Sequence, residues 1–425
     1  MANNFSHWER MVARILNVSP RLKVSVKKIY QRVIYWLHKQ PFTSRTLHQL
    51  QKIGGNSAES FFGYYDKSPL SPSGLFVIFH EAEETSIDLS RSRHSLEVVL
   101  ADARDYRPIS RFPSEAYNWQ QGTRLQWISE DRFVFNDYDA REDAYVAQVC
   151  DATSARIIAT LPAPVYDCFR DQFALTLNFD RLARLAPDYG YFCRMGRQCD
   201  LEALDADGVW RLDLKTGEKE LIVSLAKLIA LEPLQTMAGA SHSVNHIMIA
   251  PDGERFIVIH RWYKAGRRFD RLVLMSVDGS DGKVLADEQM VSHCFWLTQE
   301  RILAYLRGEG GRDCYWVLDV NEGGFRELKC PQLAKFGDGH PHAVGDWFVT
   351  DTYPDKARMQ HLLLCNLRTG EFQELGEFFH GFNFDGETRC DLHPRLSHDR
   401  QHVFFDSVFS GERKLYRLGL RSNVT

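Results

Sequence analysis

Residues 245–277 of the chain are NHIMIAPDGERFIVIHRWYKAGRRFDRLVLMSV. An apolar run ends at the turn Pro251-Asp252-Gly253, and two β-type runs follow at 256–262 and 271–277. Short runs rich in Val, Ile and aromatic residues, separated by turns of this composition, are typical of antiparallel strands. The stretch therefore predicts a compact unit of sequential strands, of the size of one propeller blade.

Similar units recur along the chain. The paired β-type runs are 76–79 with 96–100, 133–135 with 144–149, 173–179 with 209–214, 256–262 with 271–277, 301–306 with 314–320, 347–353 with 361–367, and 402–408 with 414–420. Neither a sandwich nor a β-helix gives seven similar units of this length. We therefore predict an all-β fold, a seven-bladed β-propeller with four-stranded blades, over residues 46–425.

Two segments depart from the simple repeat. Residues 180–245 form an irregular insertion, and long insertions on one face of a propeller often build a binding site. The last unit, counted from His393, leaves room for only three strands before the chain reaches Leu420. We expect residues 46–53, TLHQLQKI, to supply the missing outer strand, because this closes the ring and removes an exposed edge.

Residues 1–45 are predicted to form a basic helical extension, divided at Pro20. Apolar residues in its second part fall at spacings of three and four, as on one face of a helix. The region 1–40 contains eight Lys and Arg residues and a single acid, Glu9. Such a helix either lies peripherally on an anionic membrane surface or packs on the main domain or a partner. The apolar positions are Leu22, Val26, Ile29, Val33 and Leu37.

The bulk composition excludes several classes of protein. The formal net charge is −4, which gives no reason to expect a nucleic-acid partner. The chain contains no run of about 18 apolar residues and no secretory leader at its start, so we expect no membrane span. Nine cysteines without a CxxC pair favour a reduced, cytoplasmic compartment, at the inner membrane if the basic helix binds lipid.

Four histidines mark the second half of the chain. His246, His293, His340 and His393 are separated by 47, 47 and 53 residues, at or just before the first strand of successive units. Because first strands line a propeller's axis, we expect four imidazoles on one arc of the channel mouth, with His342 sharing the strand face of His340. The set could bind a divalent metal with one histidine left as a base. The alternative is a repeated histidine that only makes hydrogen bonds within each blade.

Other polar residues favour a site over a packing motif. Arg389, Asp391 and His393 alternate, so all three face one side of an extended segment. Tyr65 and Gln121 lie at the starts of earlier blades, where aromatic rings and amides suit sugars. We therefore expect Arg389 to act in catalysis, and the substrate contacts to be Tyr65, Gln121, Arg261 and Asp391.

Four stretches from the second half carry a resemblance to a known family. They are NHIMIAPDGERFIVIH, SHCFWL, HPHAVGDWFVTD and HPRLSHDRQHVFFDSVFSGERKLY. In these the chain resembles the oligogalacturonate lyases, cytoplasmic seven-bladed propellers that cleave uronic-acid oligosaccharides by β-elimination with a manganese-type divalent ion. It is also similar to uncharacterised propellers of bacterial surface-polysaccharide clusters.

The resemblance implies roles for individual residues. His293 and His340, with His342, match metal ligands, and His246 matches the base that abstracts the proton; His393 completes the predicted metal set. The family's metal-binding glutamine is missing from the stretch before His340, where Asp338 is available instead. The expected function is a metal-assisted lyase, with Mn as the expected divalent ion, that acts on a uronic-acid-containing oligosaccharide in bacterial polysaccharide metabolism.

Two other functions remain open from the sequence. The first is a non-catalytic propeller that binds a glycan or a glycosyltransferase in surface-polysaccharide assembly. The second is glycoside hydrolysis by paired carboxylates, for which Asp338, Asp351, Asp391 and Asp406 are available.

Overall fold

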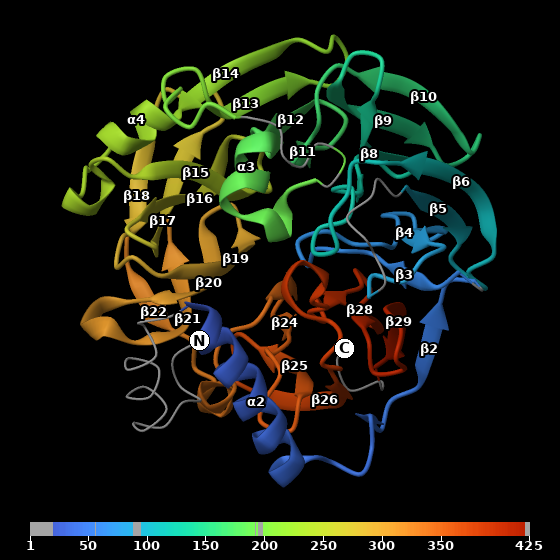
Figure 1. The fold of residues 1–425 in the computed structure, drawn as a ribbon. Coiled ribbons are helices and arrows are strands. Elements are labelled where there is room, and N and C mark those ends of the chain that lie inside the picture. Colours follow the sequence, from blue (N-terminus) through green and yellow to red (C-terminus); the bar gives the residue numbers. More distant parts are fainter. Residues whose placement is uncertain (1–19, 56, 88–94, 192, 194–198, 421–425) are drawn as a thin grey trace.

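The structure is a computed structural model that describes residues 20–420, apart from 56, 88–94, 192 and 194–198. Within these residues the strands form seven sheets arranged in a ring, which confirms the predicted seven-bladed propeller (Figure 1). The part of the predicted N-terminal extension that precedes Pro20, residues 1–19, lies outside the described residues. Its second part is α2 (Pro20–His38).

Each blade is an antiparallel sheet whose first strand lies nearest the axis. Blade 1 contains β3 (Glu59–Phe61), β4 (Phe76–Ala82), β5 (Leu96–Asp102) and β6 (Pro108–Ser114). Blade 2 contains β7 (Gln126–Trp127), β8 (Arg132–Asp139), β9 (Ala144–Asp151) and β10 (Arg156–Leu161). Blade 3 contains β11 (Asp167–Phe169), β12 (Phe173–Thr176), β13 (Gly208–Asp213) and β14 (Lys219–Ser224).

The second half continues the pattern. Blade 4 contains β15 (Ser241–Ile249), β16 (Arg255–Lys264), β17 (Arg267–Ser276) and β18 (Gly282–Ala286). Blade 5 contains β19 (Val291–Thr298), β20 (Arg301–Arg307), β21 (Asp313–Asp319) and β22 (Phe325–Glu327). Blade 6 contains β23 (His342–Val344), β24 (Trp347–Thr350), β25 (Met359–Asn366) and β26 (Phe372–Phe379), and blade 7 begins with β27 (Arg395–Leu396), β28 (His402–Ser407) and β29 (Lys414–Gly419).

The N-terminal part of the chain closes the ring. β2 (Leu50–Ile53) is the outermost strand of blade 7 and pairs with β29, with Leu50 opposite Leu418 and Ile53 opposite Leu415. This confirms the predicted closing strand. The chain also adds β1 (Ser44–Arg45) to the edge of blade 6, next to β26. Residues that precede blade 1 therefore complete blade 7 and add a fifth strand to blade 6.

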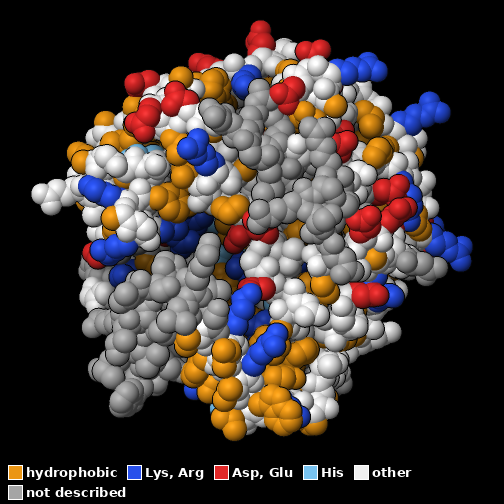
Figure 2. All heavy atoms as spheres, in the orientation of Figure 1, with side chains coloured by type: hydrophobic (Ala, Val, Ile, Leu, Met, Phe, Trp, Pro, Cys, Tyr) orange, Lys and Arg blue, Asp and Glu red, His pale blue; other side chains and the backbone are white. Residues whose placement is uncertain are grey.

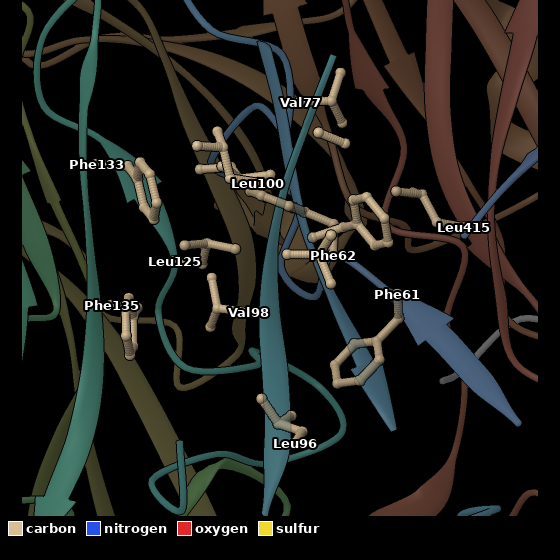
Figure 3. Packing of buried hydrophobic residues seen from close by; sticks show 14 of the residues in the cluster. Phe61, Phe62, Val77, Leu96, Val98, Leu100, Leu125, Phe133, Phe135 and Leu415 are labelled. Carbon is tan, nitrogen blue, oxygen red and sulfur yellow. The ribbon is translucent and has the colours of Figure 1, made fainter. Parts of the chain in front are cut away.

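Apolar side chains fill the space between neighbouring blades. At the junction of blades 7, 1 and 2, Phe61 and Phe62 lie between Leu415 of β29 and the β5 side chains, with Phe133 of blade 2 on the far side (Figure 3). Ile53 of the closing strand belongs to the same buried cluster. The closing strand thus contributes an apolar side chain to the core as well as main-chain pairing.

Shortening Ile53 tests this closure. Because Ile53 is fully buried, Ile53→Ala is expected to lower the free energy of unfolding by about 2–4 kcal/mol. Its exposed neighbour Lys52 provides the matched control, and Lys52→Ala should change the same quantity by less than about 0.5 kcal/mol. Chemical denaturation of both variants measures the difference. Equal stability of the two would contradict the role of β2 in closing the ring.

The irregular region around 180–245 is two excursions from blade 3. The first contains α3 (Phe179–Leu185) and the short helix η2 (Pro187–Tyr189), between β12 and β13. The second contains α4 (Leu225–Ala230) and η4 (Gln235–Met237), between β14 and β15. Asn178 caps α3 by accepting a hydrogen bond from the Arg181 amide. η2 contacts η7 (Gly386–Thr388), a turn just before blade 7, so the first excursion reaches across to the last blade.

α2 lies over the face of the ring that is turned to the viewer in Figure 1, next to blade 6. It is held by Tyr35, whose ring centroid lies 5.6 Å from that of Phe379 and 5.4 Å from that of Phe382. Among the residues that the structure describes, no helix is both long and apolar enough to cross a membrane.

Candidate functional site

The four repeated histidines meet at the centre of the ring. Ring centroids of His246 and His293 lie 5.8 Å apart, those of His293 and His340 4.0 Å, and those of His340 and His393 4.3 Å. All four side chains are buried. The structure therefore arranges the imidazoles of blades 4 to 7 in blade order along one arc.

Three of these imidazoles are held by their Nδ1 atoms. His340 Nδ1 lies 2.8 and 3.0 Å from the two carboxylate oxygens of Asp351, and His293 Nδ1 lies 3.2 Å from Asp338 Oδ1. His393 Nδ1 lies 2.8 Å from the carbonyl oxygen of Gly63. Since carboxylates and carbonyls only accept, the Nδ1–H donates in each case and the lone pair is left on Nε2. This is the arrangement in which metal-binding histidines are usually oriented.

Part of this arc has the spacing of a metal site. Ligand atoms of His340, Asp391 and His393 all lie within 4.8 Å of one another. His393 Nε2 is buried and has no hydrogen-bond partner among the described residues. Because a buried acceptor without a partner is costly, this atom indicates a ligand that the protein itself does not supply. Two imidazoles and a carboxylate suit a divalent transition ion such as Mn²⁺ or Zn²⁺.

Asp391 also binds a cation of the protein. Arg389 Nε and Nη2 each lie 2.8 Å from Asp391 Oδ2, and the Arg389 guanidinium lies over the ring of Tyr353. About a quarter of the Arg389 side chain is exposed. The alternation of Arg389, Asp391 and His393 therefore places a cation, an anion and an imidazole together, as expected.

His246 is held differently from the other three. Its ring stacks on Tyr64 at 5.3 Å between centroids, and the Tyr64 hydroxyl lies 3.0 Å from Nδ1 and 3.2 Å from Nε2. His246 and His393 both adopt left-handed backbone, with φ of 52° and 43°. Few non-glycine residues adopt this conformation, and where it occurs it is often found at functional sites.

Gly63 fixes the acceptor of His393. Its φ is 110°, and a Cβ there would lie 2.8 Å from the Gln121 carbonyl carbon, so only glycine fits. The segment from Phe62 to Tyr65 thereby brings the Gly63 carbonyl to His393 and the Tyr64 hydroxyl to His246. Blade 1 thus supports histidines from blades 4 and 7.

The pKa values of the imidazoles differ along the arc. Burial, together with the Arg261 and His293 charges, holds the pKa of His246 well below 6.5. Burial and the neighbouring His340 likewise lower the pKa values of His293 and His393. Burial also lowers the pKa of His340, but the carboxylate of Asp351 outweighs it and the net pKa is raised. The site therefore keeps a neutral imidazole at His246 and favours positive charge around His340.

His342 lies apart from the arc. It begins β23, where its ring packs on Phe295 with centroids 4.8 Å apart. Its Nδ1 accepts a hydrogen bond from the Leu396 amide, and burial lowers its pKa to about 3. The structure therefore places this predicted ligand within the blade packing, and it is not part of the group formed by His340, Asp391 and His393.

The predicted substrate contacts lie around the site, but several are already engaged. The Tyr65 hydroxyl donates to the Cys294 carbonyl, and the ring edge faces His293. Gln121 donates to the Tyr166 hydroxyl, which in turn accepts from the His246 amide. Arg261 pairs with Asp270 at 2.6 Å. The geometry therefore makes Tyr65 and Gln121 supports of the histidine arc.

The sequence did not predict that two further residues would hold the histidines of the site. Asp351 accepts from His340 and from the backbone amide of His393, and Tyr64 touches His246. No local motif links Asp351 to His393 or Tyr64 to His246, since each pair comes from different blades. The signal for Asp351 was the polar end of the apolar strand at Thr350-Asp351-Thr352, and the signal for Tyr64 was its place beside Tyr65 in an aromatic blade entry.

The face that carries this site is hollowed near its centre, and acidic and basic side chains lie inside the hollow (Figure 2). Tyr189 of η2 stands at 5.5 Å from the His246 ring, and Tyr353 at 6.0 Å from the His340 ring, between centroids. Both are partly exposed. The histidines are thus flanked by aromatic rings of the kind that stack on sugars.

Comparison with solved structures places the fold near one group of enzymes. An "Oligogalacturonate lyase in complex with manganese" superposes with a TM-score of 0.60 at 14% identity, over 89% of this chain and 95% of that one. An oligogalacturonate lyase from Vibrio parahaemolyticus gives a TM-score of 0.56 at 14% identity, over 90% and 98% of the two chains. No protein-family model matches the chain, and no curated protein matches it by sequence. At 14% sequence identity, this similarity shows that the fold is shared.

Proposed function

We propose that the chain is a metal-assisted lyase that cleaves uronic-acid-containing oligosaccharides by β-elimination. The observation that carries the proposal is the set of three imidazoles whose Nδ1 atoms are fixed by Asp338, Asp351 and the Gly63 carbonyl. A histidine used only to bond within its blade would not leave its Nε2 buried without a partner, as His393 does. The fold supports the proposal, because it is shared with oligogalacturonate lyases.

The residues present fit a divalent ion. His340 and His393 would offer Nε2 atoms and Asp391 a carboxylate oxygen, with His293 beside them. A bound Mn²⁺ would supply Lewis acidity toward the uronate carboxylate. Asp351 positions both histidines, since its carboxylate accepts hydrogen bonds from the His340 ring and from the backbone amide of His393.

His246 is the proposed base. The proton on C5 of a uronate becomes acidic only when the adjacent carboxylate is neutralised, and a neutral imidazole can then accept it. The C4–O bond breaks as the C4–C5 double bond forms, and the leaving oxygen is protonated from water. Burial keeps the pKa of His246 low, so its ring is in the accepting form at neutral pH. The Tyr64 hydroxyl holds the ring from one side.

Arg389 is proposed to engage the acidic substrate. Its guanidinium is partly exposed and already lies beside Asp391 and over Tyr353. A substrate carboxylate could share its remaining donors, because guanidinium offers five. Tyr353 and Tyr189 would provide ring faces for the sugar.

Two measurements on the same protein test the proposal. Purified protein incubated with Mn²⁺ should retain the ion and should produce the ultraviolet absorbance of an unsaturated uronyl product on at least one member of a panel of uronides. His340→Ala should lose both properties. His361→Ala is the matched control, because His361 belongs to a second His/Glu group on blade 6 and should leave both unchanged.

The outcomes separate the possible functions. Loss of the ion in His361→Ala alone would assign the metal site to the second group, formed by His361, Glu374 and Glu377. Uronide binding without new absorbance, and with no effect of His340→Ala, would favour the non-catalytic glycan-binding propeller.

A further inference from the structure

One surface of the molecule has no role in the proposed chemistry. On α2 the side chains of Ile29, Val33, Trp36 and Leu37 are 64, 54, 71 and 73% exposed. They form a ridge of large apolar groups on one side of the helix, while Tyr35 packs on the propeller. Apolar side chains gather over this region at the lower edge of the face in Figure 2. A contiguous patch of this kind is usually an interaction site.

The surroundings of the ridge are basic. Residues 20–40 contain no acidic residue. Lys28, Arg32 and Lys39 are exposed along the helix and its end, and Lys39 Nζ lies 4.2 Å from the centroid of the Trp36 ring. The side chains of the ion pair between Lys28 and Asp385 are 63 and 67% exposed, so the pair restrains the helix little. A binding partner for this surface must therefore offer both an apolar region and negative charge.

We propose that α2 docks the protein on a membrane surface that contains anionic lipids. The ridge would enter the boundary between headgroups and acyl chains, Trp36 would lie at the headgroup level, and the basic side chains would contact lipid phosphates. A protein partner with an acidic rim would need a matching groove, whereas lipid adapts to any convex ridge. The convex shape of a lone helix favours the membrane.

The position of α2 connects this surface to the histidine site. Tyr35 and Lys28 contact Phe379, Phe382 and Asp385. This segment leads directly into Arg389, Asp391 and His393, and its turn η7 contacts η2 beside the channel mouth. Docking through α2 would therefore hold the mouth of the site near the lipid surface.

Vesicle flotation tests the docking surface with the full chain. The protein should float with vesicles of phosphatidylcholine mixed with phosphatidylglycerol, and much less with phosphatidylcholine alone. Leu37→Glu should abolish flotation, and Lys28→Gln and Lys39→Gln should each weaken it roughly fivefold. Ile157→Glu is the matched control, since Ile157 is 44% exposed on β10 of blade 2 and should leave flotation unchanged.

Three results would overturn the proposal. They are absence of flotation with both vesicles, equal flotation with both, or flotation that survives Leu37→Glu. A concentration-dependent dimer that Leu37→Glu dissociates, without flotation, would assign the ridge to a second copy of the chain. Elimination on soluble uronides should be unchanged in Leu37→Glu, so failure of the docking surface is distinguishable from failure of the lyase activity.

Discussion

Replacement of His246 by asparagine is expected to lower the rate of uronide elimination by about 10²–10⁴-fold, with the metal retained. His246 is the one imidazole of the arc whose Nδ1 is not held by a carboxylate or a carbonyl, and its contact is the Tyr64 hydroxyl. It lies outside the group of His340, Asp391 and His393. Its loss should therefore remove proton abstraction and leave metal binding intact.

Asparagine is the appropriate substitution because His246 has a φ of 52°. Among residues with a Cβ, asparagine adopts this conformation most readily, so the backbone should be preserved. His342→Gln serves as the control, since His342 is a buried imidazole next to Phe295 and should affect the rate only modestly. Single-turnover absorbance and elemental analysis give the two readouts. A His246→Asn protein with nearly wild-type turnover would assign the base to another residue.

Periodic features of the fold could be predicted from the sequence because each blade repeats the same local pattern. The three-strand shortfall after His393 indicated that an outer strand was missing, and β2 fills that place opposite β29. The excursions after β12 and β14 follow no repeat. Their course depends on tertiary anchors such as Arg271, which donates to carbonyl oxygens at the end of α4.

The residues of the site likewise divide into those that the repeat pattern predicts and those that it does not. Spacing alone predicted that His246, His293, His340 and His393 would share one arc, since each was expected at or just before the first strand of its blade. It also suggested that His342 would join His340, because alternate residues of a strand share a face. However, two residues along a strand span about 7 Å, and His342 therefore packs one layer away, on Phe295. The contacts of Asp351 with His393 and of Tyr64 with His246 form between blades, and no local pattern encodes them.

Asp406→Ala is expected to destabilise the protein by about 3–5 kcal/mol, the cost of leaving a buried charge without its partner. Asp406 on β28 accepts hydrogen bonds from the amides of Phe62 and Gly63, at 2.9 and 3.0 Å. It also pairs with Arg395 at 2.9 Å, where both side chains are almost fully buried. Arg395 in turn donates to the Gly63 and Tyr64 carbonyls. The ion pair lies within blade 7, and its two side chains hold the main chain of Phe62, Gly63 and Tyr64 in blade 1 by hydrogen bonds.

The double variant Arg395→Met/Asp406→Leu separates the charge from the packing. With both charges removed, no buried ion is left alone, so stability should recover in part relative to Asp406→Ala. Urea denaturation gives the free energies, and metal retention of the folded double variant gives a second readout. The Gly63 carbonyl holds His393, and without Arg395 and Asp406 its position is no longer fixed. We therefore expect metal affinity to stay reduced even where stability returns, because the same contact that closes the ring also orients the ligand. If both the stability and the metal affinity recovered fully, packing alone would be enough to position blade 1 for the site.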